Sequence, residues 1–226
     1  MLNFVKSRVG VSIAMAALLL TPPAMAVSGA SEGPPAGLEQ VAKSRFDTLY
    51  WRPGASLQQY SSVVIADDIP VEFRDDWQRD QNRFRGLPNA VEDADAERIR
   101  GMMADSLRHV LESQLSESGG YPVVDAPGEG VLLLKPAIVE LDVFAPDILT
   151  PNITRVFTQS TGRMTLQMDL YDAATNELVG RIVDRQLARD QRFRVRLTNR
   201  VTNRFESEIV MRRWGARLRA MLDESR

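Results

Sequence analysis

The clearest pattern in the chain is a strict alternation of apolar and polar side chains over residues 164–171. Successive side chains of a β-strand point to opposite faces of a sheet, so this period of two predicts a half-buried strand. A turn-forming run follows at 172–177, in which Asn176 suits a positive φ. Residues 178–187 then predict the returning strand of a hairpin.

Two shorter stretches also have the composition of strands. Residues 60–73 are rich in β-branched side chains and predict a first strand, with an irregularity at Asp67 and Asp68. Residues 121–124 predict a short strand, whereas the polar residues 77–88 predict a loop.

Residues 131–144 predict a long strand. It begins with an apolar run typical of a strand buried on both faces, and then alternates with Val139, Leu141 and Val143 on one side. Because proline has no N–H to donate to a neighbouring strand, Pro136 predicts a sheet edge or a bulge at that point.

Two stretches have the three- and four-residue spacing of an amphipathic helix. The first begins near Asp93 or Asp95, either of which can cap it. It ends at about Glu117, before the paired glycines 119–120. Its predicted buried stripe is Ile99, Met102, Met103, Leu107, Val110, Leu111 and Leu115. The second helix begins at about Asn199, with the stripe Val201, Phe205, Ile209, Trp214, Leu218 and Leu222.

These elements predict an α+β fold of two layers, because each apolar stripe must pack against another surface to leave water. The expected architecture is a mostly antiparallel sheet of four or five strands with two main amphipathic helices packed on one face.

The N-terminus has the features of a secretory signal. Lys6 and Arg8 form a positive leader, and an apolar run of 12 residues follows at 9–20. Ala24-Met25-Ala26 then places small residues before a cleavage site at Val27. The run is shorter than the roughly 20 residues of a spanning helix. We therefore expect a periplasmic protein exported by a cleaved signal peptide, with no transmembrane segment after signal removal; the alternative is an uncleaved membrane anchor.

The chain divides on this basis into a signal peptide (1–26), a flexible leader and strap (27–58) and a single α+β domain (59–226). The leader is small and proline-bearing up to Gly37. Residues 38–57 are too apolar for a free linker, and we expect them to strap across the domain.

The side chains of most common catalytic centres are scarce. The chain has no cysteine, which excludes a disulfide scaffold and a lipid anchor on a mature N-terminal cysteine. Its one histidine, His109, lies on the polar face of the first helix, which favours a solvated surface residue over a catalytic base. Neither a nucleophile elbow nor a phosphate-binding glycine motif is present. We therefore expect no catalytic residue, no metal and no cofactor.

Two pairs of adjacent carboxylates remain as candidates for acid–base chemistry or for a hard cation such as calcium. They are Asp67 with Asp68, and Asp75 with Asp76. Adjacent residues on a strand point to opposite faces, so neither pair converges on one substrate unaided. Solvated loops are the favoured interpretation for both.

Charge is distributed unevenly along the chain. Residues 27–180 carry 13 basic and 24 acidic side chains, whereas residues 181–219 carry 12 arginines and 4 acidic side chains. This asymmetry allows the two parts to complement each other, or leaves a basic surface for an anionic partner.

The stretch DQRFRVRLTNR (190–200) concentrates this basic character. Arg192, Arg194 and Arg196 alternate with apolar residues, so an extended backbone would place three guanidinium groups on one face. These arginines are our anion-binding candidates, since guanidinium groups suit phosphate and carboxylate. Two alternatives are that they protect a sheet edge from other chains, or that they pair with acidic residues of the first half.

Three stretches, taken in order, resemble a known family. They are LYWRPGASLQQYSSVVIADDIPVEFRDDW (49–77), GGYPVVDAPGEGVLLLKPAIVELDVFAPD (119–147) and TLQMDLYDAATNELVGRIVDRQLARD (165–190). From about Leu49 to Leu222 the chain resembles the bacterial envelope family catalogued as domain of unknown function 3313. The resemblance implies an exported α+β envelope protein and brings no biochemical activity with it. Many relatives resemble lipoproteins, from which this chain departs because it has no cysteine.

We therefore expect a non-enzymatic periplasmic binding or accessory protein in cell-envelope assembly or maintenance. Its partner is expected to be an envelope protein or an anionic envelope component, such as a lipid headgroup or peptidoglycan, and not nucleic acid. One alternative is a carboxylate-only hydrolase acting on cell-wall glycan, which needs two acidic groups about 5 to 10 Å apart across a cleft. The other is a sheet-edge subunit of an envelope complex, which needs an unpaired marginal strand.

Changing Arg192, Arg194 and Arg196 together to glutamine tests the anion-binding candidates. We expect the wild-type protein to be retained on anionic liposomes or cell-wall fragments, and retention to fall as salt is raised, because exposed charges are screened. Co-sedimentation of the triple variant should show a clear loss. Undiminished retention would rule out an anion-binding role for these residues.

Overall fold

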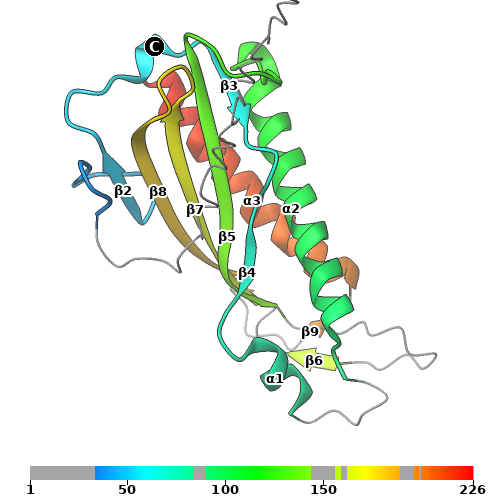
Figure 1. Cartoon of the computed structure of the whole chain (residues 1–226). Helices are drawn as coiled ribbons and strands as arrows, with labels where there is room; N and C mark the ends of the chain where they lie inside the picture. The colour runs from blue at the N-terminus through cyan, green and yellow to red at the C-terminus, as the bar shows by residue number, and fades with distance from the viewer. Residues whose placement is uncertain are drawn as a thin grey trace, which may run out of the picture.

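Seven strands form one mixed sheet, and two long helices cover one of its faces (Figure 1). The computed structural model describes residues 34–83, 90–143, 156–158, 162–188, 196–198 and 200–225. The strands are β1 (Glu39–Gln40), β2 (Thr48–Trp51), β3 (Ser62–Ile65), β4 (Val71–Phe73), β5 (Val131–Val143), β7 (Gly162–Asp172) and β8 (Glu177–Ala188). Their order across the sheet is β1-β2-β8-β7-β5-β3, and β4 also pairs with β5.

The helices are α1 (Trp77–Asn82), α2 (Asp93–Ser116) and α3 (Arg200–Asp223), with short 3-10 turns at Leu57–Gln59 and Glu117–Gly119. A second, two-stranded sheet pairs β6 (Val156–Thr158) with β9 (Arg196–Thr198). Figure 1 shows β6, β9 and α1 at the end of the molecule opposite the C-terminus. No helix in the described stretches is long and apolar enough to cross a membrane.

The predicted α+β class is confirmed, but the sheet is larger than the predicted four or five strands. The segment expected to strap across the domain supplies β1 and β2, which add to the edge of β8. The single strand expected over 60–73 divides into β3 and β4, both parallel to β5, so the sheet is mixed. The short strand expected at 121–124 is reduced to one bridge between Val63 and Val123.

The division between β3 and β4 explains how β5 accommodates a proline. Asp67 and Asp68 lie in the loop between the two strands, where the irregularity was predicted. β3 pairs with β5 up to Leu134 and β4 pairs with β5 from Ile138, so Pro136 falls in the gap. A missing N–H is harmless on this side because neither β3 nor β4 stands opposite Pro136, which pairs with Met168 of β7 on the other side. The predicted edge or bulge at Pro136 is therefore a local edge.

Residues 77–88 are not all loop, which corrects the prediction made from their polarity. The six residues of α1 form a helix because its first side chain is anchored in the core: Trp77 is 2% exposed and its indole N–H donates to the Val143 carbonyl at 2.7 Å. At the other end, the Asn82 side chain both donates to and accepts from the backbone of Val91. Tertiary contacts therefore stabilise a helix too short to form alone.

The start of α2 lies one residue before the predicted cap. Glu92 is the N-cap, and Asp95 accepts a hydrogen bond from the Glu92 N–H at 3.2 Å, as in a capping box. The helix ends as expected, with Gly119 at a φ of 75°.

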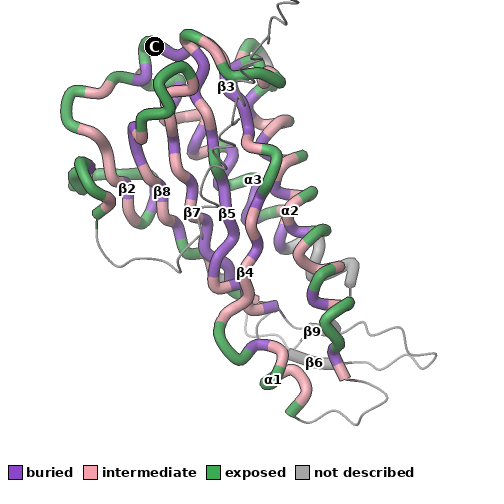
Figure 2. Tube along the Cα trace, viewed as in Figure 1, coloured by how far each residue is buried: buried purple, intermediate pink, exposed green. Residues whose placement is uncertain are grey.

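Most of the predicted helical stripes are buried. In α2 these are Met103, Leu107, Val110, Leu111 and Leu115, and in α3 they are Trp214, Leu218 and Leu222. Two predicted members are wrong: Met102 is 40% exposed and Ile209 is 36% exposed. Each precedes a buried residue, Met103 or Val210, by one step of about 100° around the helix, which carries it out of the interface. Figure 2 shows long buried stretches along the central strands, which lie over this helix layer.

The β7–β8 turn is held by one carboxylate. Asp172 accepts hydrogen bonds from the backbone N–H groups of Ala174 and Thr175, and from the Tyr60 hydroxyl at 3.1 Å. The bond from the Thr175 backbone contributes most to lowering the pKa of Asp172. Asn176 has the predicted positive φ, at 56°.

Asp184 on β8 is completely buried, at 0% exposure, and joins three parts of the chain. From α3, the Trp214 indole N–H donates to it at 2.8 Å and the Arg217 guanidinium contacts both oxygens at 2.9 and 3.0 Å. From the segment before β2, the Asp47 backbone N–H donates at 3.0 Å. The Gln186 side chain supplies a further bond at 2.7 Å. A buried carboxylate surrounded by donors in this way couples the N-terminal strands, the sheet and the last helix.

Replacing Asp184→Asn should destabilise the protein by about 2–4 kcal/mol, because it leaves the Arg217 guanidinium without its counter-charge and turns an acceptor into a donor. Urea unfolding followed by circular dichroism measures the change. Arg185→Gln, which removes an exposed ion pair on the next residue, is the matched control and should cost under about 1 kcal/mol. Equal effects of the two substitutions would contradict a special role for Asp184.

Candidate functional site

A pocket of about 480 Å³ lies between β4, α1 and the first half of α2. We call it the β4–α1 pocket; it is lined by residues 71–79 together with Ala96 and Arg100. Most of its wall is one continuous stretch of chain, since only three residues separate β4 from α1, and α2 supplies the remaining two lining residues. Ligand sites favour such concave surfaces with a few placed polar groups.

An aromatic stack forms one side of this pocket. The rings of Phe73 and Trp77 lie parallel, with centroids 3.8 Å apart and an interplanar angle of 12°. The guanidinium carbon of Arg100, on α2, lies 5.1 Å from the centroid of the Phe73 ring. Such a cation–π contact holds the guanidinium in a defined position. The stack therefore connects β4, α1 and α2 through three neighbouring side chains.

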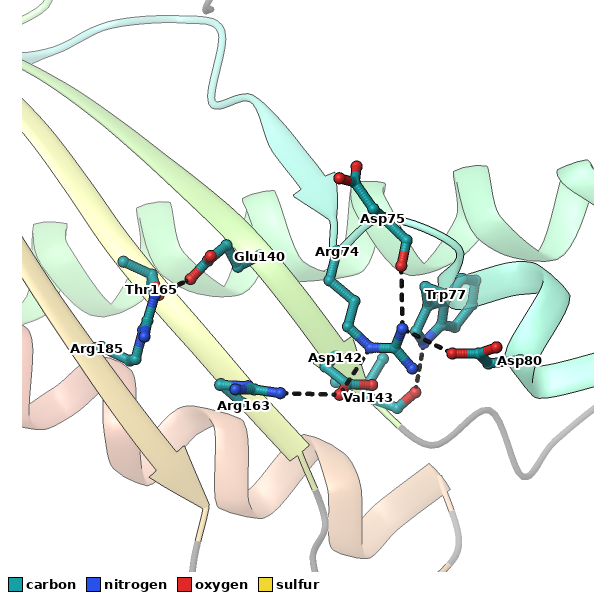
Figure 3. Close-up of polar contacts among 10 residues, drawn as sticks. All are labelled: Arg74, Asp75, Trp77, Asp80, Glu140, Asp142, Val143, Arg163, Thr165 and Arg185. Atoms are coloured by element: carbon teal, nitrogen blue, oxygen red, sulfur yellow. Dashed lines mark hydrogen bonds and ion pairs between the residues drawn. The ribbon is translucent and has the colours of Figure 1, made fainter. Parts of the chain in front are cut away.

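Arg74 ties the pocket to the end of β5 (Figure 3). Its guanidinium donates to Asp80 at 2.8 Å, to the Asp75 carbonyl at 3.0 Å and to Asp142 at 2.9 Å. The hydrogen bond to Asp80 is the largest cause of the raised pKa of Arg74, and the bond to Asp142 adds to it against the lowering by burial. Arg74 is thus held in place, and two carboxylates compensate its positive charge.

A β-bulge at Glu140 positions Asp142 for this contact. Glu140 has a φ of 53°, and the register of β5 on β7 shifts between Val139 and Asp142. The extra residue moves Leu141 and Val143 onto the core face shared by Ile138, while Val139 lies outside the core cluster. The prediction that Val139 shares a side with Leu141 and Val143 is therefore wrong, since a bulge shifts the alternation by one residue.

The bulge also organises two polar links across the sheet. Glu140 accepts hydrogen bonds from Thr165 at 3.2 Å and from Arg185, which joins β5 to β7 and β8. Asp142 lies 3.6 Å from Arg163 on β7 as well as contacting Arg74. Figure 3 shows these side chains on neighbouring strands, with Asp142 and Arg163 on the side nearest Arg74 and Trp77.

The other two arginines that line the pocket are held in weak ion pairs. Arg79 pairs with Asp76 at 2.6 Å, and these side chains are 74% and 51% exposed. Arg100 pairs with Glu97, three residues earlier on α2, and these are 38% and 71% exposed. Exposed pairs of this type contribute little to stability, so their partners exchange readily.

The carboxylate pairs picked out from the sequence have separate positions. Asp75 and Asp76 line the β4–α1 pocket, but Asp76 is paired with Arg79 and the Asp75 carboxylate points away from Arg74 (Figure 3). Asp67 and Asp68 are exposed in the β3–β4 loop, as predicted. Among the described residues, no group of three or more acidic, histidine or cysteine side chains is arranged to hold a metal.

The other candidates lie apart from the pocket. His109 is exposed on α2, as predicted for a solvated histidine. Arg192 and Arg194 lie outside the described residues, and only the backbone of Arg196 is described, in β9.

Sequence reasoning missed the residues that form the pocket. Phe73, Arg74 and Trp77 fall in a stretch whose polarity predicted the end of a strand and a loop. The available signal was the FRDDW run, since aromatic residues four positions apart beside an arginine are unusual for a solvated loop. Arg100 carried no such signal, because it joins the stack only through the packing of α2.

The chain belongs to the family described as "Protein of unknown function (DUF3313)", whose model matches residues 34–218. This confirms the resemblance drawn from the three quoted stretches. No curated protein matches the sequence.

Two solved structures show a weak overall likeness. They are two crystal forms of the PelC dodecamer from Paraburkholderia phytofirmans, one of them of a point variant. Identity is 12% and 10%, the TM-score is 0.34 for both, and the alignments cover 76% of this chain and 96% and 94% of PelC. At these TM-scores the likeness carries no argument about this chain.

The positive φ of Glu140 predicts how substitutions at this position affect stability. Glu140→Gly should leave the protein about 1 kcal/mol more stable than Glu140→Ala, because both remove the carboxylate and only alanine resists a positive φ. Thermal or urea unfolding compares the two. At Gln167, a regular position of β7, the same pair of substitutions should rank in the opposite order. The same ranking at both positions would contradict a strained bulge.

Proposed function

We propose that this protein is a non-enzymatic periplasmic binding or accessory protein in cell-envelope assembly or maintenance. Its partner would be an envelope protein or an anionic envelope component. The features of a secretory signal at the N-terminus support export to the periplasm, and the absence of cysteine supports a protein without a lipid anchor.

The observation that carries the proposal is the composition of the β4–α1 pocket. A concave surface beside an aromatic stack, with the guanidinium groups of Arg100 (38% exposed) and Arg79 (74% exposed) at its wall, is suited to recognition. Arginine and aromatic side chains are also the residues most enriched where proteins bind partners.

The carboxylates around the pocket support binding over hydrolysis. A glycan hydrolase needs one carboxyl group that is protonated and another that is free to attack or to activate water. Asp80 and Asp142 are instead both held by the Arg74 guanidinium, and Asp76 is held by Arg79, so none of the three is free for either role.

The edge strands β1 and β3 offer little free backbone for a partner strand, so a sheet-edge subunit is the weaker alternative. β1 has two residues, and β3 is bridged by Val123 on its outer side. Strand addition needs a longer free edge, since its affinity comes from successive main-chain hydrogen bonds.

Cell fractionation with site-specific photo-crosslinking tests the proposal. We expect the mature protein in the periplasmic fraction, starting at Val27, with a crosslinker in place of Asp75, which is exposed and lines the pocket, giving adducts that mass spectrometry identifies as an envelope component. A crosslinker at Ser113, exposed on α2 and not part of the pocket lining, is the matched control and should give none. A cytoplasmic protein that retains residues 1–26 would contradict the proposed export. Release of reducing ends from purified peptidoglycan by the protein would contradict a non-enzymatic role.

A further inference from the structure

We infer that the β4–α1 pocket binds an oxyanion, a carboxylate or a phosphate monoester, between the guanidinium groups of Arg100 and Arg79. This inference deepens the proposed function by naming the chemical class of ligand at the same pocket. The shared chemistry is a compact group with two or more anionic oxygens, which matches the planar fork of a guanidinium.

Three arginines line the pocket: Arg74 follows β4, Arg79 lies on α1 and Arg100 lies on α2. Arg74 is held by Asp80 and Asp142 in a partly buried network, so its charge is already compensated. Arg79 and Arg100 have exposed partners three residues earlier, at the N-cap of α1 and on α2. An incoming anion can replace those partners at little cost, because such pairs contribute about 0.2–1 kcal/mol.

The aromatic stack positions Arg100. Its guanidinium lies over the Phe73 ring, which in turn stacks on the buried Trp77. Trp77 is fixed by its hydrogen bond to Val143, so the three side chains connect the core to the pocket. A ligand that replaces Glu97 therefore meets a guanidinium that is already positioned over the ring. Less entropy is then lost on binding than for a freely rotating arginine.

Three acidic residues, Glu72, Asp75 and Asp76, also line the pocket. The Asp75 carboxylate points away from Arg74 (Figure 3), whereas Asp76 is held by Arg79 at 2.6 Å. On α2, Arg100 is held by Glu97 in the same way. An incoming oxyanion therefore competes with Asp76 and Glu97 for the two guanidinium groups, and both of these pairs are weak because their carboxylates are more than half exposed.

Titration of the purified protein with three probes tests the inference. The probes are glycerol 1-phosphate, D-glucuronate and, as a neutral control, glycerol, followed by calorimetry and by the NMR signal of the Trp77 indole N–H. We expect one or both anions to bind and to shift that signal, glycerol to do neither, and binding to weaken with added salt. The two anionic arms distinguish a phosphate source from a carboxylate source.

Four variants make the test specific. Arg100→Gln should weaken anion binding about tenfold or more, and Arg79→Gln severalfold, because each removes charge-assisted hydrogen bonds. Glu97→Gln should tighten it by about two- to threefold, since it removes the competitor for Arg100. Arg98→Gln is the matched control, because Arg98 is 36% exposed and paired with Asp95 on the same helix but does not line the pocket; it should leave affinity unchanged.

The inference is overturned if neither anion binds the wild-type protein, if Arg100→Gln and Arg79→Gln retain full affinity, or if Glu97→Gln weakens binding. Such a failure is distinguishable from failure of the proposed function. Envelope adducts from position 75 without anion binding would reject only the ligand class. Cytoplasmic protein that binds anions would reject the periplasmic role and keep the site.

Discussion

The Asp184 carboxylate connects segments that are far apart in the chain. It is fully buried on β8, and its donors come from Asp47, more than a hundred residues earlier, and from Trp214 and Arg217 on the last helix. A buried carboxylate is tolerated only when donors surround it, so the two ends of the domain must both be in place for either to be stable. Helix α3 and the segment before β2 therefore pack against β8 through one hydrogen-bond network, which sets the position of both relative to the sheet.

The bulge at Glu140 connects this part of the sheet to the residues of the pocket. Because β5 is held by β7 along most of its length, one extra residue turns Asp142 toward Arg74 and keeps Leu141 and Val143 in the core. Arg74 and the Trp77–Val143 hydrogen bond then attach α1 to the end of the strand. A positive φ at a glutamate is unfavourable by itself, and strain of this kind persists where surrounding contacts determine it. The pocket thus depends on a local distortion held in place by a long, well-paired strand.

Electrostatic pairing accounts for part of the uneven charge distribution along the sequence. Arg181 pairs with Asp169 and Arg185 with Glu140, so basic residues of the last part neutralise acidic residues of the first. On α3, Arg217 reaches Asp184, whereas Arg219 donates to the Leu115 and Glu117 carbonyls at the end of α2 and so satisfies acceptors that the helix leaves open. Part of the charge asymmetry in the described part of the chain is therefore compensated by internal contacts, of which Arg181–Asp169 and Arg217–Asp184 are the more buried.

Periodicity alone determined the α+β class, the long helices, the β7–β8 hairpin and the break at Pro136, because each depends on which face of a local element is apolar or on a missing N–H. The tertiary structure decided the parallel pairing of β3 and β4, the addition of β1 and β2, and the helix at α1, since these depend on contacts between distant residues such as Trp77 and Val143. It likewise decided the site. Phe73 and Arg100 are separated by α1 and the start of α2, and no local pattern shows that a ring on a strand and a guanidinium on a helix will stack once the core has packed.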